Sequence, residues 1–395
     1  MGFRVVVSKA SFGLRLPVLF LVCLISSFLL FTFLVACVAV FKEESFLVLF
    51  SCFCWGDFMR CLVTAAFHED GLSILRELMD VEYRSWRDTG KIYLDGGELA
   101  SLVNEVGADV LVVESDFVTR DTIEKCDLKV IASCRDDPYN VDLRAATAKK
   151  VPVVYAPRRN TIAVAELTVA LMLAAMRRIV RADRLLRSGR VKYTGPRDFI
   201  EVYNATLGFE LSGKKVGIVG LGAIGFEVAK RLRAFDVEIL VYDPYVDPER
   251  LRAVDGRTVG LKELFQESDI VTVHCRLTQE TAGMIREEHF AAMKPTAFFV
   301  NLARGGIVDE DALFKALKEG RIAGAALDVV QHDPAQSDNR FLTLDNVVLT
   351  PHIGGNTHDT IRRQSIMVAE DIREILRGGK PKNVLNPEVL KQEGK

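Results

Sequence analysis

The sequence predicts an α/β fold with two doubly wound parallel sheets, and three observations support this class. Apolar segments of strand length alternate with segments of helical periodicity over residues 59–376. The turn Gly220-Leu221-Gly222-Ala223-Ile224-Gly225 follows one apolar segment and opens a helix. The chain has 395 residues, 49% apolar and 26% charged, as is usual for a globular protein with more than one domain.

The glycine turn has the G-x-G-x-x-G spacing of a Rossmann dinucleotide-binding domain. Gly220 permits the turn, Gly222 lets a pyrophosphate approach the backbone, and Gly225 lets the helix pack on the strand. Free N–H groups at the new helix N-terminus favour a phosphate there. A glycine-rich turn without a ligand is the alternative.

An acid at the end of the next apolar segment strengthens the dinucleotide prediction. Asp243 lies 18 residues after Gly225, near the spacing at which an acid contacts the adenosine ribose. A 2′-phosphate would meet this carboxylate, so the sequence predicts NAD rather than NADP as the cofactor.

The charge and cysteine content narrow the class of protein. The formal net charge is −2 and the sequence has no basic tail, so a nucleic-acid partner is not expected. In a chain this long, 8 cysteines do not make a disulfide scaffold, and the sequence has no zinc-spaced CxxC…CxxC set. Reduced thiols, a cytoplasmic location and no metal are therefore expected.

Residues 1–58 form a hydrophobic N-terminal extension unlike the rest of the chain. The uncharged run from Leu16 to Phe41 is long enough to span a bilayer. The basic residues before it would keep the N-terminus inside and send the rest outside, where a soluble nicotinamide cofactor is not normally available. Met59 opens directly into a predicted strand. We therefore expect the native protein to begin at Met59; a membrane anchor and a cleaved signal sequence are the alternatives.

The predicted elements divide into two sheets. Strands are expected at 61–66, 110–113, 130–133 and 151–155, with helices at 71–78, 98–106, 122–125 and 141–149. A long helix, 161–188, and an extended arm, 195–211, precede the glycine turn. Further strands are expected at 216–219, 239–243, 270–274, 297–301, 324–328 and 347–350, and a last helix, 357–376, is expected to pack on the first domain.

The predicted architecture is a Rossmann NAD-binding domain, 158–355, inserted into a flavodoxin-like substrate domain, 59–157 and 356–395. The long helix and the arm belong to the inserted domain.

Polar residues follow several predicted strands, where a redox site would need them. Arg304 follows a strand and precedes a glycine pair, so a guanidinium that binds a planar carboxylate bidentately is expected at a sheet edge. A surface salt bridge to Asp309 or Glu310 is the alternative. His352 lies between a proline and a glycine pair, on a loop where a catalytic histidine is plausible.

Together with the glycine turn, these loops resemble the D-isomer-specific 2-hydroxyacid dehydrogenase family, which includes 3-phosphoglycerate, glyoxylate/hydroxypyruvate and D-lactate dehydrogenases. The resemblance extends over residues 60–380, and the matching blocks are 220–225, 274–283, 301–313, 324–328 and 350–355. It implies an oxidoreductase that uses NAD and a small 2-keto or 2-hydroxy acid, and a homodimer in contact through the long helix and the arm.

The resemblance also implies the site residues. The family's motif arginine, acid and histidine fall on Arg304, Asp333 and His352. The residues implied in cofactor binding are Gly220, Gly222, Ala223, Ile224, Gly225, Asp243, His274, Cys275, Thr281, Leu302, Ala303, Asp328 and Gly354. Those implied in substrate binding are Cys134, Arg135, Arg304 and His352.

Three residues near the expected site depart from the family pattern. Asp333 stands where a longer glutamate is usual, and Asp136 and Asp137 stand where the substrate loop usually has glycines. Carboxylates beside an anionic substrate are unfavourable unless they point away or meet Arg135. An NAD(H)-sensing, catalytically weak protein resembling the family's corepressors is therefore the alternative function, and a membrane partner is expected only if residues 1–58 are genuine.

Overall fold

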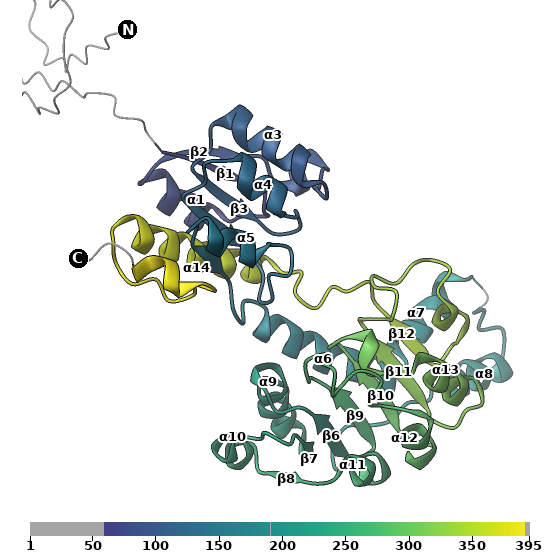
Figure 1. Ribbon diagram of the computed structural model, residues 1–395. Helices are drawn as coiled ribbons and strands as arrows, with labels where there is room; N and C mark the ends of the chain where they lie inside the picture. Colours follow the sequence, from purple (N-terminus) through teal and green to yellow (C-terminus); the bar gives the residue numbers. More distant parts are fainter. Residues whose placement is uncertain (1–58, 190, 392–395) are drawn as a thin grey trace, which may run out of the picture. The chain divides into compact units, whose positions relative to one another are not determined.

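Figure 1 shows the computed structural model, which describes residues 59–189 and 191–391. The N-terminal extension, 1–58, lies outside the described residues, so its interpretation as a wrongly assigned start, an anchor or a signal stays a prediction. Within the described ranges, no helix has both the length and the apolar character needed to cross a membrane.

The first sheet has five parallel strands in the order β2-β1-β3-β4-β5, which is the flavodoxin-like order. The strands are β1 (Arg60–Val63), β2 (Asp80–Tyr83), β3 (Val110–Val113), β4 (Val130–Ser133) and β5 (Val153–Tyr155). β3 and β4 are buried along their whole length, which explains their continuous apolar sequence. The helices of this part are α1 (Glu69–Arg76), α2 (Trp86–Thr89), α3 (Gly96–Val106), α4 (Arg120–Lys125) and α5 (Leu143–Ala148).

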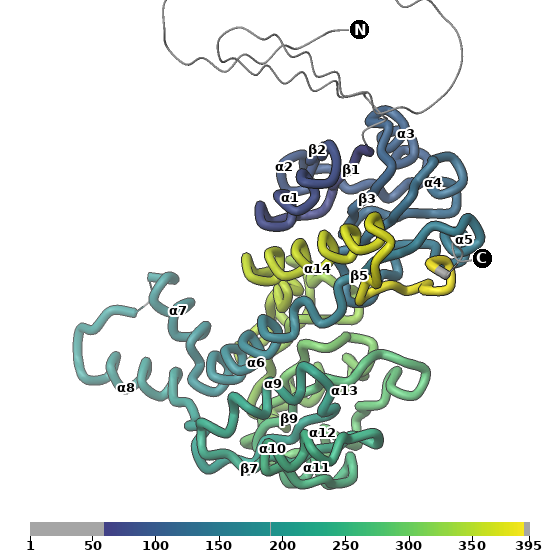
Figure 2. The backbone as a smooth tube through the Cα atoms, turned by 90° about the vertical axis from the view of Figure 1, so that its left-hand side faces the viewer, coloured from purple at the N-terminus to yellow at the C-terminus, as the bar shows by residue number. Residues whose placement is uncertain are grey.

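The last helix, α14 (His358–Leu376), packs against this first sheet, as the sequence predicts. Figure 1 shows it beside α1, and Figure 2 shows it beside β5, although it lies more than 200 residues beyond β5 in the chain. Val368, Ala369 and Ile372 are buried in the same apolar cluster as Cys61 and Val63 of β1. Burial of this apolar face holds α14 to the first sheet.

The second sheet has seven parallel strands in the order β12-β11-β10-β9-β6-β7-β8. Counted from β6, this is the Rossmann order 3-2-1-4-5-6 with one more strand at the edge. The strands are β6 (Lys215–Val219), β7 (Glu238–Tyr242), β8 (Gly256–Thr258), β9 (Ile270–Val273), β10 (Phe298–Asn301), β11 (Gly324–Leu327) and β12 (Val347–Leu349). The helices are α6 (Thr161–Met176), α7 (Ile179–Arg187), α8 (Pro196–Ala205), α9 (Ala223–Leu232), α10 (Pro248–Ala253), α11 (Leu261–Glu267), α12 (Glu287–Ala292) and α13 (Glu310–Lys318). The predicted fold class is thereby confirmed.

The single long helix predicted over 161–188 is wrong, because the chain divides it into α6 and α7. Arg178 between them adopts φ +51°, a left-handed conformation that ends an α-helix. The carbonyl oxygen of Met176 accepts a hydrogen bond from the Phe209 N–H at 2.9 Å. A Cβ atom at Gly208 would lie 2.5 Å from that same oxygen. The returning backbone therefore occupies the place where the helix would continue.

The extended arm predicted over 195–211 is also wrong, because most of it forms α8. Pro196 stands at the first helical position, where its missing N–H costs nothing. Asp198 caps the helix by accepting hydrogen bonds from the Thr194 and Gly195 N–H groups at 2.7 and 3.2 Å. None of the α8 residues is buried, and Figure 2 shows α7 and α8 standing away from the seven-stranded sheet.

Two strands that the sequence does not predict lie at sheet edges. β2 and β8 each pair with one neighbour, and their residues are half-buried or exposed. Edge strands need no continuous apolar sequence, so the apolar pattern gives no signal for them.

Candidate functional site

The glycine turn lies at the carboxyl end of β6 and opens α9, as the sequence predicts. Gly220 has φ +92°, a conformation that side chains rarely adopt. A Cβ atom at Gly225 would lie 2.1 Å from the Gly220 carbonyl oxygen, so only glycine lets α9 pack this closely. By contrast, apart from Gly222 and its two chain neighbours, no described atom lies within 4 Å of a Cβ position at Gly222. The open space therefore lies at Gly222, the glycine that a pyrophosphate would approach. Ala223 and Ile224 follow it at the N-terminus of α9.

Asp243 follows β7 and lies next to the glycine turn. Its Oδ2 accepts a hydrogen bond from the Leu221 N–H, and its Oδ1 accepts one from the Tyr245 N–H, both at 2.9 Å. The Asp243 carboxylate therefore holds the glycine turn in place. Its side chain is also half-exposed, so it remains accessible beside the turn.

The loop after β9 covers the other side of the turn. The backbone N of Cys275 would lie 2.8 Å from a Cβ atom at Gly220, so the two loops are in close contact.

Burial lowers the pKa of His274 to about 3, and its Nε2 lies 2.9 Å from the Thr272 hydroxyl. Burial also raises the pKa of the Cys275 thiol to about 11. Both groups are therefore neutral near pH 7. Further along, Thr281 donates a hydrogen bond to the Arg276 carbonyl at 2.5 Å and closes the loop.

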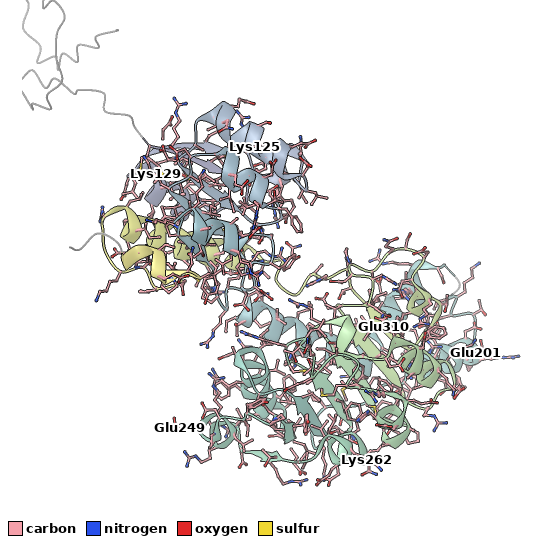
Figure 3. The ribbon with its side chains drawn as sticks, in the orientation of Figure 1. Lys125, Lys129, Glu201, Glu249, Lys262 and Glu310 are labelled. Atoms are coloured by element: carbon pink, nitrogen blue, oxygen red, sulfur yellow. The ribbon has the colours of Figure 1, made fainter. Side chains whose placement is uncertain are left out.

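Arg304 follows β10, and its side chain is exposed. Its Nη1 donates to the Ala303 carbonyl at 2.7 Å, and no ion pair to this guanidinium is present in the described part of the chain. The predicted alternative, a salt bridge to Asp309 or Glu310, does not form. Asp309 caps α13, and Glu310, labelled in Figure 3, accepts a hydrogen bond from the Gln331 N–H.

Close packing brings the Arg304 loop to the loop that follows β11. A Cβ atom at Gly305 would lie 2.1 Å from the Val330 carbonyl carbon. Leu302 is buried beneath the loop, and the Ala303 N–H donates to Asn301 Oδ1 at 3.0 Å. The glycine after the arginine is therefore needed for the two loops to meet.

Asp328, at the end of β11, holds the loop that carries the histidine. It is 1% exposed, and its carboxylate accepts hydrogen bonds from the Thr350 hydroxyl at 2.6 Å and from the Ile353 and Gly354 N–H groups at 2.8 Å each. Its carbonyl accepts one from the His352 N–H at 2.9 Å. The role toward the cofactor that the resemblance implies for Asp328 stays a prediction.

His352 and Asp333 are in direct contact. Nδ1 of the imidazole is hydrogen-bonded to Oδ2 of the carboxylate, although the acid is one methylene shorter than the usual glutamate. His352 has φ +55°, and its side chain is 43% exposed. Because one ring nitrogen meets the acid, Nε2 is the nitrogen left to meet a substrate.

The loop after β4 carries the predicted substrate-binding residues. Cys134 is fully buried, and burial raises the pKa of its thiol well above the usual value. The Arg135 Nη2 donates to the Tyr139 hydroxyl at 2.9 Å, and its guanidinium carbon lies 4.4 Å from the centroid of that ring. Burial lowers the pKa of Arg135, and the positive charges of Arg159 and Arg304 contribute to this shift. Arg135 and Arg304 therefore act on each other electrostatically.

One of the two acids in this loop is already bonded to protein. Asp136 Oδ1 accepts a hydrogen bond from the Arg158 N–H at 2.6 Å, where Arg158 has φ +58°. Its carboxylate is thus occupied by the backbone of the segment that leads into α6. Asp137 is exposed and lies one residue further along.

A half-buried ion pair between Glu114 and Arg159 is not among the predictions made from the sequence. Glu114 follows β3, and its Oε1 accepts from Arg159 Nη1 at 2.9 Å; the side chains are 12% and 16% exposed. Arg159 also donates to Gln364 of α14, while its buried Nε has no partner within the described ranges. An acid directly after a buried strand was the available signal, as it is for Asp243 and Asp328.

The chain is similar to known dehydrogenases. Residues 169–354 match the family model described as "D-isomer specific 2-hydroxyacid dehydrogenase, NAD binding domain". The chain is 42% identical over 341 residues to a D-3-phosphoglycerate dehydrogenase of Methanocaldococcus jannaschii, a match that covers 85% of this chain but only 61% of that relative. It is 39% identical over 343 residues to a glyoxylate reductase of Thermofilum pendens, covering 84% of this chain and 96% of the relative.

A solved structure shows the same fold. A crystal structure of a Thermus thermophilus protein superposes with a TM-score of 0.72 at 34% sequence identity, covering 83% of this chain and all of the other. The chain belongs to the D-isomer specific 2-hydroxyacid dehydrogenase family, and its seven-stranded domain is the family's NAD-binding domain.

Proposed function

We propose that this protein is an NAD-dependent D-2-hydroxyacid dehydrogenase, which transfers a hydride reversibly between NADH and a small 2-keto acid. The observation that supports this most directly is the contact between His352 and Asp333 on loops packed beside the loop of Arg304. An acid, a histidine and an arginine without an ion pair among the described residues lie at one sheet edge, and these are the groups that carbonyl reduction needs.

The glycine turn would hold the cofactor. The open space at Gly222 and the N-terminus of α9 suit the pyrophosphate, and the half-exposed Asp243 suits the adenosine ribose. We expect the other residues of the surrounding loops to line the same site: Ala223, Ile224, His274, Cys275, Thr281, Leu302, Ala303, Asp328 and Gly354. When bound, NADH supplies the hydride.

Arg304 would bind the carboxylate of the substrate and polarise its ketone. Its guanidinium is exposed and without an ion pair in the described part of the chain, so it is available for bidentate binding. Arg135, on the loop after β4, would contribute a second positive charge to the same carboxylate. Cys134 is buried, so it would contribute backbone and not its thiol.

His352 would protonate the oxygen as the alkoxide develops, and would remove that proton in the reverse reaction. Asp333 bonds Nδ1, which orients the ring so that Nε2 faces the substrate. Asp328 would act through the loop, since its three accepted hydrogen bonds fix the residues on both sides of His352.

The proposed assembly is supported by a surface outside this site. α7 and α8 expose a set of large apolar side chains, and burial of such a patch against a second copy supports a homodimer. The set comprises Ile179, Leu186, Phe199, Ile200 and Tyr203. We propose a cytoplasmic location, where NADH is available, and we propose 59–157 with 356–395 as the substrate domain and 158–355 as the NAD-binding domain.

The reaction is tested by NADH oxidation with a panel of 2-keto acids. The names of the relatives make phosphohydroxypyruvate, hydroxypyruvate and glyoxylate the first substrates to try, in the manner of a phosphoglycerate dehydrogenase or a glyoxylate/hydroxypyruvate reductase. Turnover that is lost in His352→Ala supports the proposal. Tight NADH binding without turnover of any keto acid would instead favour the NAD(H)-sensing alternative.

A further inference from the structure

Loops after three strands of the five-stranded sheet present aromatic side chains at its carboxyl edge. Trp86 follows β2, Phe117 follows β3 and Tyr139 follows β4; we call these three residues the aromatic row. Tyr139 is 64% exposed, and its ring centroid lies 6.2 Å from that of Phe117. Trp86 Nε1 donates to Glu114 Oε2 at 3.3 Å. The row therefore joins apolar surface to the ion pair described above.

The aromatic row adjoins the proposed catalytic groups. Arg135 stacks on the ring of Tyr139 and interacts electrostatically with Arg304. Arg87, the residue after the first member of the row, donates to Asn356 Oδ1 at 2.8 Å, at the end of the loop that carries the catalytic histidine. The hydrogen bond from Arg87 to Asn356 thus connects the row with the loop of His352.

Beside Trp86, Glu114 and Arg159 offset each other's charge, and the exposed Arg87 is hydrogen-bonded to Asn356. Glu114 neutralises Arg159 in a half-buried pair. Arg135 and Arg304 remain without ion pairs in the described part of the chain, and two guanidinium groups suit one carboxylate and the ketone next to it. A second anionic group on the substrate would find no uncompensated cation at this pair, and Glu114 would repel it.

We propose that the site prefers a 2-keto acid with one negative charge and an apolar side chain that the aromatic row contacts, and that Glu114 disfavours substrates with a second anionic group. This inference rests on the proposed dehydrogenase function and narrows its substrate. The apolar side chain would leave water for aromatic surface, while the carboxylate stays with the arginines.

The full chain is tested with phenylpyruvate, glyoxylate and phosphohydroxypyruvate, following NADH oxidation at saturating NADH. We expect kcat/KM for phenylpyruvate to exceed that for glyoxylate by about tenfold, and phosphohydroxypyruvate to be the poorest of the three. A preference for phosphohydroxypyruvate overturns the inference but leaves the dehydrogenase function intact. No oxidation with any of the three, or with hydroxypyruvate, contradicts the dehydrogenase function itself.

Tyr139 gives a test at an exposed position, where substitution does not threaten the fold. Tyr139→Ala should lower the ratio of kcat/KM for phenylpyruvate to that for glyoxylate by about tenfold. Tyr139→Phe is the matched control, since it keeps the ring and should keep the ratio. If Tyr139→Ala alters the oligomeric state and leaves the ratio unchanged, the row is a contact between chains and the inference is overturned.

Glu114→Gln tests the charge argument, because it keeps the shape and removes the negative charge. The uncompensated Arg159 should then raise kcat/KM for phosphohydroxypyruvate relative to glyoxylate by about tenfold. Glu105→Gln, at an exposed glutamate paired with Arg84, is the control and should leave this ratio unchanged. An unchanged ratio in folded Glu114→Gln overturns the role of Glu114, and the wild-type panel still tests the substrate class if this variant fails to fold.

Discussion

The contact between His352 and Asp333 is the residue-scale feature on which the proposed chemistry depends. His352→Ala should lower kcat by about 10²- to 10⁴-fold, because no other described side chain takes its place as proton donor on that loop. His332→Ala removes an exposed histidine one residue before Asp333 and should retain activity. Steady-state kinetics of the two variants distinguish them, and an active His352→Ala enzyme would refute the assignment.

Asp328 supports that histidine through three accepted hydrogen bonds. Asp328→Asn replaces one acceptor oxygen with an N–H₂ donor that faces other donors, so it should lower the free energy of unfolding by about 1–3 kcal/mol and also lower kcat. Urea unfolding and kcat measured on the same preparation test this. Wild-type stability in Asp328→Asn would show that the loop does not depend on the carboxylate.

The sequence predicts the residues of this site better than it predicts their partners. Arg304, Asp333 and His352 each lie in a short motif after a strand, and the structure brings their loops together. The Glu114–Arg159 pair joins residues that lie 45 positions apart in the chain, so no local sequence pattern predicts that they are partners.

At the scale of elements, Gly222 and Gly225 of the glycine turn have different roles: Gly225 allows close packing, and Gly222 leaves space for a ligand. Gly225→Ala should destabilise the protein by several kcal/mol, on the order of the most damaging substitutions, because its Cβ would lie 2.1 Å from a backbone oxygen. Gly222→Ala has space for its Cβ, so it should remain folded but bind NADH more weakly. Thermal unfolding and NADH titration separate the two effects; equal NADH affinity in Gly222→Ala and wild type would place the pyrophosphate elsewhere.

The strand-end histidine of β9 makes stability depend on pH. The pKa of His274 is about 3 in the folded protein and 6.5 in its ordinary, unfolded environment. Between these two pH values the unfolded chain therefore binds more protons than the folded one. Stability should therefore decrease as the pH falls, by about 2 kcal/mol between pH 7 and pH 5 from this group. His274→Gln should lack this part of the pH dependence in urea unfolding. Identical slopes for both proteins would contradict the burial argument.

Elements with a buried face are predicted well, and the misses have physical causes. β3, β4 and α14 bury apolar residues at the expected period. The division between α6 and α7 depends on a carbonyl that accepts from a residue 33 positions later, at Phe209. The edge strands β2 and β8 have no apolar pattern to find.

At the scale of the whole molecule, the exposed face of α7 and α8 is proposed to form the dimer. Phe199→Asp places a charge within its apolar surface and should convert the dimer to a monomer in analytical ultracentrifugation. Lys262→Asp, at an exposed position of α11, is the control for a charge change elsewhere. A dimer that survives Phe199→Asp would exclude this face as the contact.

At this scale, the loops that carry Arg304, Asp333 and His352 are proposed to act together in the reduction of 2-keto acids by NADH. The most direct test is to follow NADH absorbance while the protein is mixed with phenylpyruvate, glyoxylate, hydroxypyruvate and phosphohydroxypyruvate, with His352→Ala measured beside it. The structure predicts NADH oxidation by the wild type with at least one of these acids, formation of the D-2-hydroxy acid, and loss of turnover in the variant. NADH binding without oxidation of any of them would contradict the account.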